Sequence, residues 1–384
     1  MTVYFLCMII SCIFTYLDTI KISNTIKKTR QIGFCGWIAI LIPSFLAAFR
    51  EVGVGSDTNG YGSIMFYVAT KSHSLMEYFN SNNPYVSGSE PGYRIFVYLM
   101  SRISDKITFQ FFMIEFIIMF FIYKSLKDNQ LGRKTWIGVM LYYTLFLGFS
   151  FNLMRQCLAI SVIFWATKFI YARKWKTFTI IILIVSTIQL TSIVSLSLYP
   201  LYIIFSNEER IKYKKFYSFL KKYRWLLGII TVASALAILI NGKKLMHYII
   251  HLQLKSSYAA QLGLVNTAGF NASSFILMSM FLVPFLLNLR KLLKKEKLFC
   301  FLFIVVLLSV LLWQLSMVSQ EAYRIALYFW MMIIILVPKG LCGFSKKNIN
   351  ILTFYYITLS NFYFVYYAVI IGANKIFPYT SSLI

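Results

Sequence analysis

Long apolar runs recur along the whole chain, and short polar stretches separate them. A transmembrane helix needs about 20 largely apolar residues, and the runs approach that length. They are continuous rather than alternating, which favours helices over the strands of a β-barrel. The pattern predicts an all-α polytopic integral membrane protein with about 10–12 transmembrane helices. The clearest spans lie near residues 1–17, 31–49, 107–123, 135–151, 156–171, 225–240, 274–289, 298–313, 325–338 and 349–372.

One apolar stretch, residues 177–205, has an unusual length. It holds 29 residues and has basic clusters on both sides, so it must cross the membrane an even number of times. Two full spans would need about 40 residues. We therefore expect a hairpin of two short half-helices that meet near residues 189–192. Broken helices of this kind are tolerated where protein or water satisfies the freed backbone, and they often mark a site.

Composition agrees with a membrane protein and sets aside a soluble one. Of the 384 residues, 59% are hydrophobic and only 13% are charged. A soluble core could not cover that much apolar surface. The formal net charge of +26 would suggest nucleic acid in a soluble protein. Here the membrane topology explains it, and no nucleic-acid partner is expected.

The basic residues fix the expected orientation. Most of the 38 lysines and arginines lie between the apolar runs, at residues 21–30, 124–134, 173–176, 210–224, 290–297 and 339–347. The positive-inside rule assigns these clusters to the cytoplasm. The large first loop, residues 50–106, a late loop, residues 241–273, and both chain ends are then external. We expect residues 1–384 to form one membrane domain.

The first external loop opens with a dense polar segment, residues 50–61. It contains Arg50, Gly55, Ser56, Asp57 and Tyr61. Glycines beside short polar side chains favour a tight turn whose backbone N–H groups can face a ligand. A plain structural turn is the alternative, but it would not need an arginine, a carboxylate and a tyrosine together at a helix end.

A second polar segment follows in the same loop, at Glu90, Tyr93 and Arg94. Residues 93–104 carry several apolar side chains against two arginines, Arg94 and Arg102, which is typical of a short interfacial helix. Glu90 would begin that helix, where a carboxylate caps exposed amides. Capping and catalysis both remain open for Glu90.

Two more arginines lie at predicted outward turns, beside other polar residues. Arg155 precedes Gln156, and Arg324 follows Glu321. Together with Arg50, they are contrary to the charge bias of the external side. Arginine binds phosphate oxygens with two parallel N–H groups and keeps its charge when desolvated. Anchoring to lipid headgroups is the alternative for any one of them.

These motifs, taken in order, resemble the EpsG family of membrane proteins, which is related to Wzy-type O-antigen and capsule polymerases. The resemblance spans nearly the whole chain. It is carried by Arg50 with Gly55, Ser56, Asp57 and Tyr61; by Glu90, Pro91, Gly92 and Tyr93; by Met154, Arg155, Gln156 and Ala159; by Arg324, Tyr328 and Phe329; and by Phe377, Pro378 and Tyr379. There is one departure: many relatives place His-Ser in the broken-helix region, where this chain has Thr191 and Ser192.

The resemblance implies a glycosyltransferase that joins undecaprenyl-diphosphate-linked oligosaccharide repeat units on the outer face of the bacterial cytoplasmic membrane. Arg50, Arg155 and Arg324 would stabilise the diphosphate leaving group. Asp57 or Glu90 would act as the general base, with Glu321 as a further candidate. We expect no metal and no other cofactor, and a chain-length regulator protein is a possible partner. The residues expected to contact substrate are Gly55, Ser56, Tyr61, Tyr93, Arg94, Gln156, Glu321 and Thr191.

Two other functions fit the same pattern. A flippase or transporter for lipid-linked oligosaccharides would also need many helices, basic cavities and broken segments. It should, however, show charges through its central helices and an internal repeat, neither of which is visible here. An O-antigen ligase shares the substrate and the general build, and residues alone do not exclude it.

Overall fold

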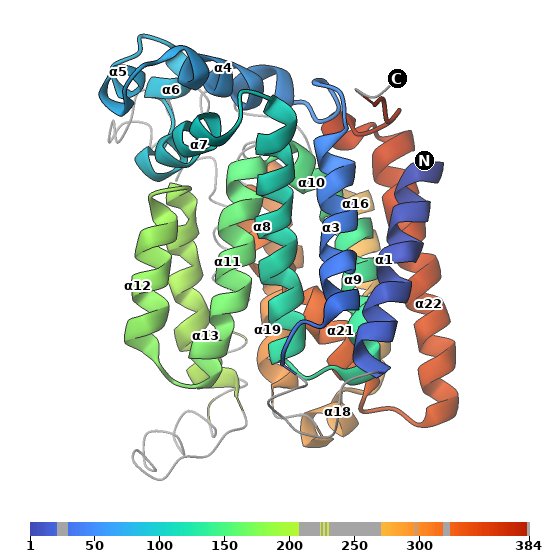
Figure 1. Ribbon diagram of the computed structural model, residues 1–384. Coiled ribbons are helices and arrows are strands. Elements are labelled where there is room, and N and C mark those ends of the chain that lie inside the picture. The colour runs from blue at the N-terminus through green and yellow to red at the C-terminus, as the bar shows by residue number, and fades with distance from the viewer. Residues whose placement is uncertain are drawn as a thin grey trace. The chain divides into compact units, whose positions relative to one another are not determined.

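The computed structural model describes residues 1–20, 30–206, 223, 226, 229, 270–295, 298–317 and 323–381. Helices dominate these residues, and no strand occurs among them (Figure 1). The fold class is therefore the predicted all-α class. The predicted span at 225–240 and most of the late loop at 241–273 lie outside the described residues, as does Glu321.

The chain divides into two compact units, residues 1–193 with 354–384, and residues 194–353. In the first unit, α1 (Thr2–Ile20) packs against α3 (Phe34–Ala48) and α9 (Thr135–Leu145). Helix α8 (Ile107–Asp128) lies between α3 and α11 (Met154–Tyr171), and α11 packs on α12 (Trp175–Ser186). The end of α22 (Lys346–Val365) and its extension η6 (Tyr366–Ile370) complete this unit.

The second unit holds α13 (Leu198–Phe205), α16 (Ala272–Met280), α17 (Val283–Leu287), α18 (Leu289–Lys295), α19 (Phe299–Leu312), α20 (Arg324–Trp330) and α21 (Ile333–Leu341). Its helices gather round α19, which contacts α13, α16, α20 and α21. Large apolar side chains such as Phe299 and Trp330 are fully buried there.

Four of the described helical segments are long and apolar enough to cross a membrane: 2–20, 107–128, 299–316 and 324–341. Shorter apolar helices occupy 34–48, 175–186 and 190–205. Three predicted spans each consist of two helices in succession, with an interruption of the helix between them. Residues 135–151 form α9 and α10 (Leu147–Asn152), 274–289 form α16 and α17, and 325–338 form α20 and α21. In the second case the reason is Pro284, which cannot donate a helical hydrogen bond and begins a new helix.

The predicted break in the stretch 177–205 is confirmed. Helix α12 ends at Ser186, three residues of turn follow, and the chain continues as the tighter helix η3 (Leu190–Ser197) before α13. The break thus begins slightly earlier than the predicted position at 189–192.

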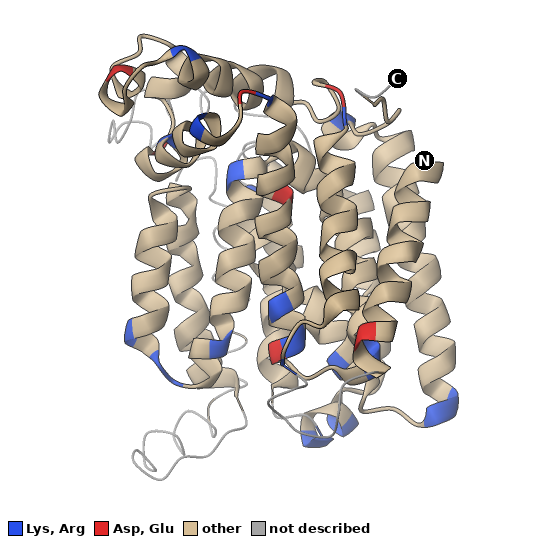
Figure 2. Cartoon of the chain, in the orientation of Figure 1, with Lys and Arg blue, Asp and Glu red and all other residues tan. Residues whose placement is uncertain are grey.

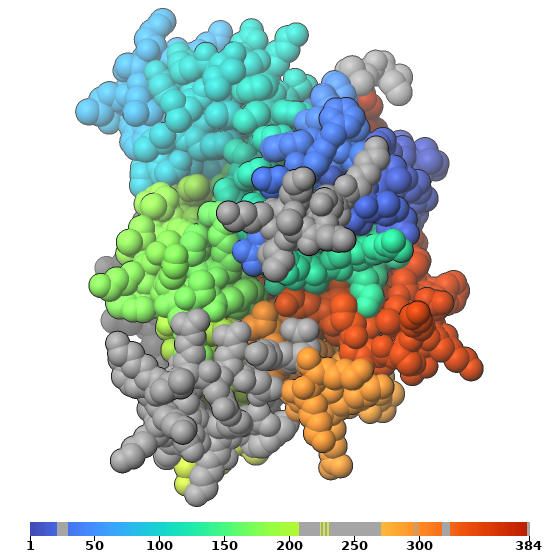
Figure 3. Space-filling view, turned by 60° about the horizontal axis from the view of Figure 1, so that its bottom comes forward, coloured from blue at the N-terminus to red at the C-terminus, as the bar shows by residue number. Residues whose placement is uncertain are grey.

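Residues 50–106 fold into a layer of short helices with its own apolar core. The helices are η1 (Thr58–Gly62), α4 (Ser63–Lys71), α5 (Leu75–Phe79), α6 (Pro84–Ser87) and α7 (Pro91–Ile103). Local sequence explains their starts, because Ser74 and Asn83 cap α5 and α6 and prolines occupy the first turns of α6 and α7. Tyr78, Val86 and Tyr93 are fully buried in the core of the layer. The layer lies across one end of α8, α11 and α12 (Figure 1) and remains a continuous block in the space-filling view (Figure 3).

Both chain ends lie beside this layer. The hydroxyl of Tyr4, in the first turn of α1, donates to the carbonyl of Ile376 at 2.7 Å, and Gly55 N–H donates to the carbonyl of Lys375 at 3.0 Å. The prediction that the two ends share a side with the 50–106 loop is therefore confirmed. In the first unit, basic residues lie in the last turns of α8 and α11, at the ends away from the layer (Figure 2), which is the side that the positive-inside rule predicts to be cytoplasmic.

At that opposite end of the first unit, a buried ion pair joins α1 to α8. The ammonium of Lys127 lies 2.8 Å from the carboxylate of Asp18, and both side chains are 2% exposed. Tyr123 donates a second hydrogen bond to Asp18 at 2.9 Å. The close approach needs Gly33, where a Cβ would lie 2.4 Å from Asp18 Oδ1.

We predict that Asp18→Ala destabilises the protein by about 3–5 kcal/mol, because it leaves a buried ammonium without its counter-charge. The measurement is the free energy of unfolding in detergent. Lys124→Ala is the control, since its pair with Asp128 is half-buried and should contribute about 1 kcal/mol or less. Equal losses from the two variants would contradict this account.

Candidate functional site

The polar segments that the sequence singled out meet at the end of the first unit that carries the helical layer. They come from the first loop after α3, from the start of α7, from the α10–α11 junction and from the break after α12. These segments are far apart along the chain: Glu90 and Leu190, which are in contact, are 100 positions apart.

The first segment, Arg50 to Tyr61, folds into a tight turn as predicted. Gly53 and Gly55 both adopt positive φ, at 122° and 101°. Thr58 closes the turn, since its Oγ1 donates to Gly55 O at 2.6 Å and accepts from Gly53 N–H at 2.9 Å. Gly55 also has no room for a side chain, because a Cβ would lie 2.4 Å from the carbonyl oxygen of Phe151. The turn therefore requires glycine for its conformation and for its packing.

Asn152, at the end of α10, binds this turn. Its Oδ1 accepts from Ser56 Oγ at 2.6 Å and from Asp57 N–H at 3.0 Å. The hydroxyl of Tyr61 donates to Asn152 O at 2.9 Å. The structure thus brings Ser56, Asp57 and Tyr61 together with the residue that precedes the Met154–Gln156 motif by two positions.

The second segment meets the third through an ion pair. A carboxylate oxygen of Glu90, Oε2, lies 2.8 Å from Arg155 Nη1, and the same nitrogen donates to Ser89 Oγ at 3.3 Å. The other carboxylate oxygen accepts from the backbone N–H of Leu190 at 3.3 Å. Glu90 is 6% exposed. The proposed capping role is wrong, because the Glu90 side chain makes no capping hydrogen bond to α7 and binds Arg155 and the broken helix instead.

Arg155 also lies over two aromatic rings of the layer. Its guanidinium carbon is 4.7 Å from the ring centroid of Tyr61 and 5.7 Å from that of Tyr93. Contacts of this kind hold a cation in place by about 0.5–2 kcal/mol each. Burial raises the pKa of the Tyr93 hydroxyl well above its usual value, so Tyr93 is neutral. Two aromatic rings and one carboxylate therefore fix the direction of Arg155.

Gly92 brings the second segment against the helix break. Its N–H donates to Thr187 O at 2.8 Å, and a Cβ on Gly92 would lie 2.8 Å from the same oxygen. The missing side chain of Gly92 allows close contact between α7 and the turn after α12. This contact supplies a donor for a carbonyl that the break leaves free.

Arg50 is buried more deeply than the prediction of an arginine at the outer membrane edge implied. It is 3% exposed, and its guanidinium lies between the rings of Phe111 and Phe151, at 4.4 and 4.2 Å from their centroids. Nη2 contacts Met154 Sδ at 3.5 Å, whereas Nε and Nη1 have no hydrogen-bond partner among the residues that the structure describes. Burial lowers the pKa of Arg50 to about 10, so the group stays positive at neutral pH. A buried cation with unused donors is suited to an anion.

Glu115, the one acidic residue that the sequence placed inside a span, pairs with a neighbouring helix. The hydroxyl of Tyr142 on α9 donates to its carboxylate. Glu115 is also the main favourable charge near Arg50. This hydrogen bond joins α8 to α9.

The remaining predicted site residues are Arg94, Gln156, Thr191 and Arg324, and for these the structure gives weaker support for a role in the site. Arg94 points into the helical layer, with its guanidinium 4.2 Å from the ring centroid of Phe79, so packing accounts for its position. Gln156 is buried in the first turn of α11. Thr191 accepts from Gln189 Nε2 at 3.3 Å within the broken region. Arg324 begins α20 in the second unit, and its role stays a prediction.

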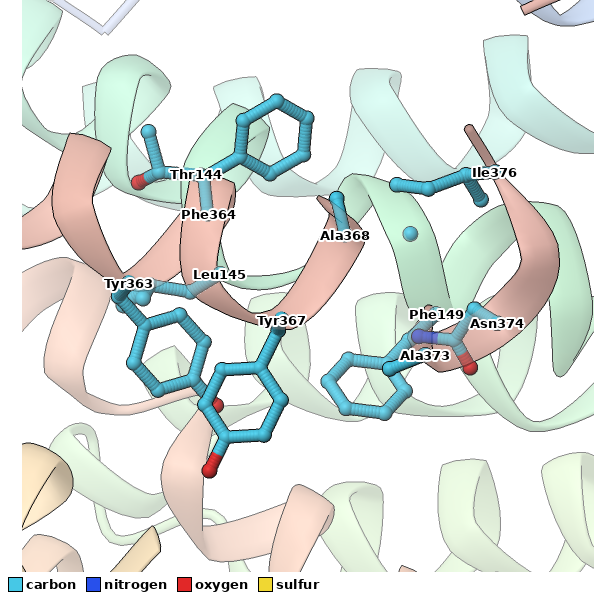
Figure 4. A pocket seen from close by; sticks show the side chains of 11 residues that line it. Thr144, Leu145, Phe149, Tyr363, Phe364, Tyr367, Ala368, Ala373, Asn374 and Ile376 are labelled. Carbon is cyan, nitrogen blue, oxygen red and sulfur yellow. The ribbon is translucent and has the colours of Figure 1, made fainter. Parts of the chain in front are cut away.

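A pocket adjoins these residues on the side of the C-terminal segment. It is a partly open pocket with about 330 Å³ of empty space, part of it open to the outside, between α9, α10 and the end of the chain (Figure 4). Its lining is mainly apolar and aromatic, and includes Phe149, Tyr363, Tyr367 and Ile376. Asn374 lies at one end of it and also accepts from Asn152 Nδ2 at 3.0 Å. Within the described ranges, no three His, Cys, Asp or Glu side chains gather as metal ligands.

Comparison with known proteins gives one match. The model of the EpsG family matches residues 33–381. The matched range includes every segment of the site described above. No curated protein and no solved structure matches the chain.

Proposed function

Since the chain belongs to the EpsG family, the family of Wzy-type polysaccharide polymerases, we propose that it joins undecaprenyl-diphosphate-linked oligosaccharide repeat units. The reaction would take place on the outer face of the bacterial cytoplasmic membrane. The helical layer of residues 50–106 would then face outward, and the apolar helices would hold the lipid part of the substrate. A chain-length regulator is a further partner that we propose.

One observation carries the proposal. The ion pair between Glu90 and Arg155, together with the bonds from Asn152 to Ser56 and Asp57, joins three separate polar segments at one end of the membrane unit. Packing alone does not require a carboxylate, an arginine and a second carboxylate-bearing loop at the same place. Such a set can bind an anionic leaving group and accept a proton.

The chemistry assigns the groups as follows. A sugar hydroxyl of the acceptor attacks the anomeric carbon of the donor, and the bond between that carbon and the diphosphate oxygen breaks. The proton of the hydroxyl passes to a carboxylate, and undecaprenyl diphosphate leaves with the bonding electrons. Negative charge therefore develops on the diphosphate, where preorganised arginines stabilise the transition state.

The geometry separates the two carboxylates that the sequence left as alternative bases. Both oxygens of Glu90 are engaged, one by Arg155 and one by Leu190 N–H, and the residue is buried. Asp57 is more exposed and lies on the turn held by Asn152. We therefore assign the general base to Asp57 and give Glu90 the task of orienting Arg155.

Of the two candidate catalytic arginines in the first unit, Arg50 and Arg155, Arg155 is the better placed for first contact with a diphosphate. Its side chain is 24% exposed although Glu90 holds one of its nitrogens. Arg50 is more deeply buried. It would complete the anion site through Nε and Nη1, which have no partner in the described part of the chain. Arg324 is a third candidate that the sequence pattern alone supports.

A cell experiment tests this function against its two alternatives. The gene is deleted in its own host, and lipid-linked glycans are extracted and sized, with and without a membrane-impermeant oxidant that cleaves sugars exposed outside. Loss of the polymerase should leave single repeat units on the lipid carrier, accessible to the oxidant. Protected single units would indicate a flippase, and long chains retained on the carrier would indicate a ligase; either result contradicts the proposal.

A further inference from the structure

The C-terminal segment supports the turn that carries Asp57. Gly55 N–H donates to Lys375 O at 3.0 Å and Ser56 N–H donates to Asn374 O at 3.2 Å. Further along, Glu51 N–H donates to Thr380 O at 3.0 Å. Three backbone hydrogen bonds thus join the first loop to residues more than 300 positions later in the chain.

Asn152 connects the same two segments through its side chain. Its Oδ1 binds Ser56 and Asp57, while its Nδ2 donates to Asn374 Oδ1 at 3.0 Å. One amide therefore bridges the catalytic loop and the C-terminal turn. Asn152 is 8% exposed, so the bridge lies away from water, where such bonds are strong and costly to lose.

The C-terminal turn has the backbone that this bridge requires. Asn374 and Lys375 both have positive φ, at 62° and 50°, and so does Gly372, two residues before Asn374, at 67°. Side-chain-bearing residues rarely adopt this region, and asparagine tolerates it best. The turn orients two successive carbonyls towards the loop and one side-chain oxygen towards Asn152. A conformation of this kind persists when the surrounding contacts select it.

We propose that Asn152 and Asn374 are positioning residues for Asp57. They fix the backbone of Gly55–Asp57, so that the Asp57 carboxylate meets the acceptor hydroxyl at a set distance from Arg155. Neither amide takes the proton itself. The inference rests on the proposed function, because it assigns the geometry of the same site.

The chemistry of asparagine suits this task better than its closest substitutes. The bridge needs an acceptor towards Ser56 and Asp57 and a donor towards Asn374, and one primary amide supplies both. An aspartate at position 152 keeps the acceptor but loses the donor, and it brings a second negative charge close to Asp57. An alanine removes both bonds and leaves Ser56 Oγ and Asp57 N–H without this partner.

The test uses the purified full chain with lipid-linked repeat units. Asn152→Ala should lower kcat for elongation by about 10- to 100-fold, since small displacements of a reacting group cost that much. KM should change by less than about threefold, because the substrate-binding arginine remains in place. Asn374→Gly keeps the positive φ and the backbone acceptor while removing only the amide, and should lower kcat by about three- to tenfold.

Asn152→Asp supplies a readout that a purely structural role would not move. The added negative charge disfavours ionisation of Asp57 and so raises its pKa. The rise of kcat with pH should therefore shift to higher pH than in the wild type. An unchanged pH profile, together with a normal kcat, would overturn the inference.

Asn361→Ala is the matched control, because among the residues that the structure describes this amide bonds only within its own helix, to Ile357 O at 2.8 Å. Its kcat should stay near the wild-type value. Thermal unfolding in detergent identifies any variant that does not fold, in which case Asn374→Gly and Asn152→Asp decide the question. If the wild type elongates glycan and all three site variants match it, the positioning role is wrong while the function stands. If the wild type itself does not elongate, the proposed function fails first.

Discussion

Replacing Asp57 with asparagine should reduce glycan elongation by at least about 100-fold, because general base catalysis contributes about 10²–10⁴-fold and the amide cannot accept the proton. The substitution keeps the size of the side chain and the backbone N–H that binds Asn152. The expected loss is therefore in kcat, with binding of the lipid-linked donor largely unchanged. The measurement is the rate of product formation under saturating substrate.

Asp105→Asn is the control for this prediction. Asp105 is an exposed carboxylate in the same layer of residues 50–106. The Asp105→Asn variant should elongate glycan at the wild-type rate. If Asp57→Asn were as active as Asp105→Asn, Asp57 would not be the base. Glu90 would then return as the candidate, despite its engagement with Arg155.

The second large effect concerns Arg155. Arg155→Ala should lower kcat/KM by about 10²–10³-fold, the amount expected when one preorganised group that stabilises a developing charge is removed. Arg155→Lys should recover part of that loss, because it keeps the charge without the two parallel N–H groups. Arg133→Ala changes an exposed arginine at the opposite end of the unit and should have no effect.

A charge exchange separates a catalytic arginine from a structural ion pair. The double variant Glu90→Arg with Arg155→Glu restores opposite charges at a pair now separated by 2.8 Å. It should recover stability relative to the single variants, as measured by thermal unfolding in detergent, but not elongation. Recovery of elongation would show that Arg155 acts only through its ion pair with Glu90. Another residue would then have to bind the diphosphate.

Much of the fold follows from the sequence because helices in lipid are determined locally. The apolar runs must satisfy their own backbone groups, so α1, α3, α8 and α11 appear close to their predicted bounds. The division of residues 135–151 at Phe146 was not predicted. No proline or glycine stands at that position, so no local breaker in the sequence pointed to it.

The site was predictable in part. Glycine, carboxylate and arginine in short segments identified the regions that meet, because polar residues are costly beside lipid. The pairing of Glu90 with Arg155 was not visible, since it joins residues 65 positions apart. Capping, one of the two roles left open for Glu90, failed for the same reason, because a local rule was applied to a residue whose side chain binds distant partners.

The roles of Asn152 and Arg50 show the same limit. A lone asparagine at the end of an apolar run has no pattern that distinguishes a bridge from a helix end. Arg50 stands next to an apolar span, which suggested the membrane edge, yet Phe111 and Phe151 enclose it. Contacts between distant segments decide both cases, and only the folded chain supplies them.

The most direct measurement follows the leaving group. The purified protein is placed in lipid vesicles with undecaprenyl-diphosphate-linked repeat units, and released undecaprenyl diphosphate is counted beside the length of the glycan. The account predicts one diphosphate released for each bond formed, with lengthening chains in the wild type and about 1% of that rate or less in Asp57→Asn. Vesicles in which the wild type moves the lipid-linked units across the membrane, yet releases no diphosphate and lengthens no chain, would contradict it.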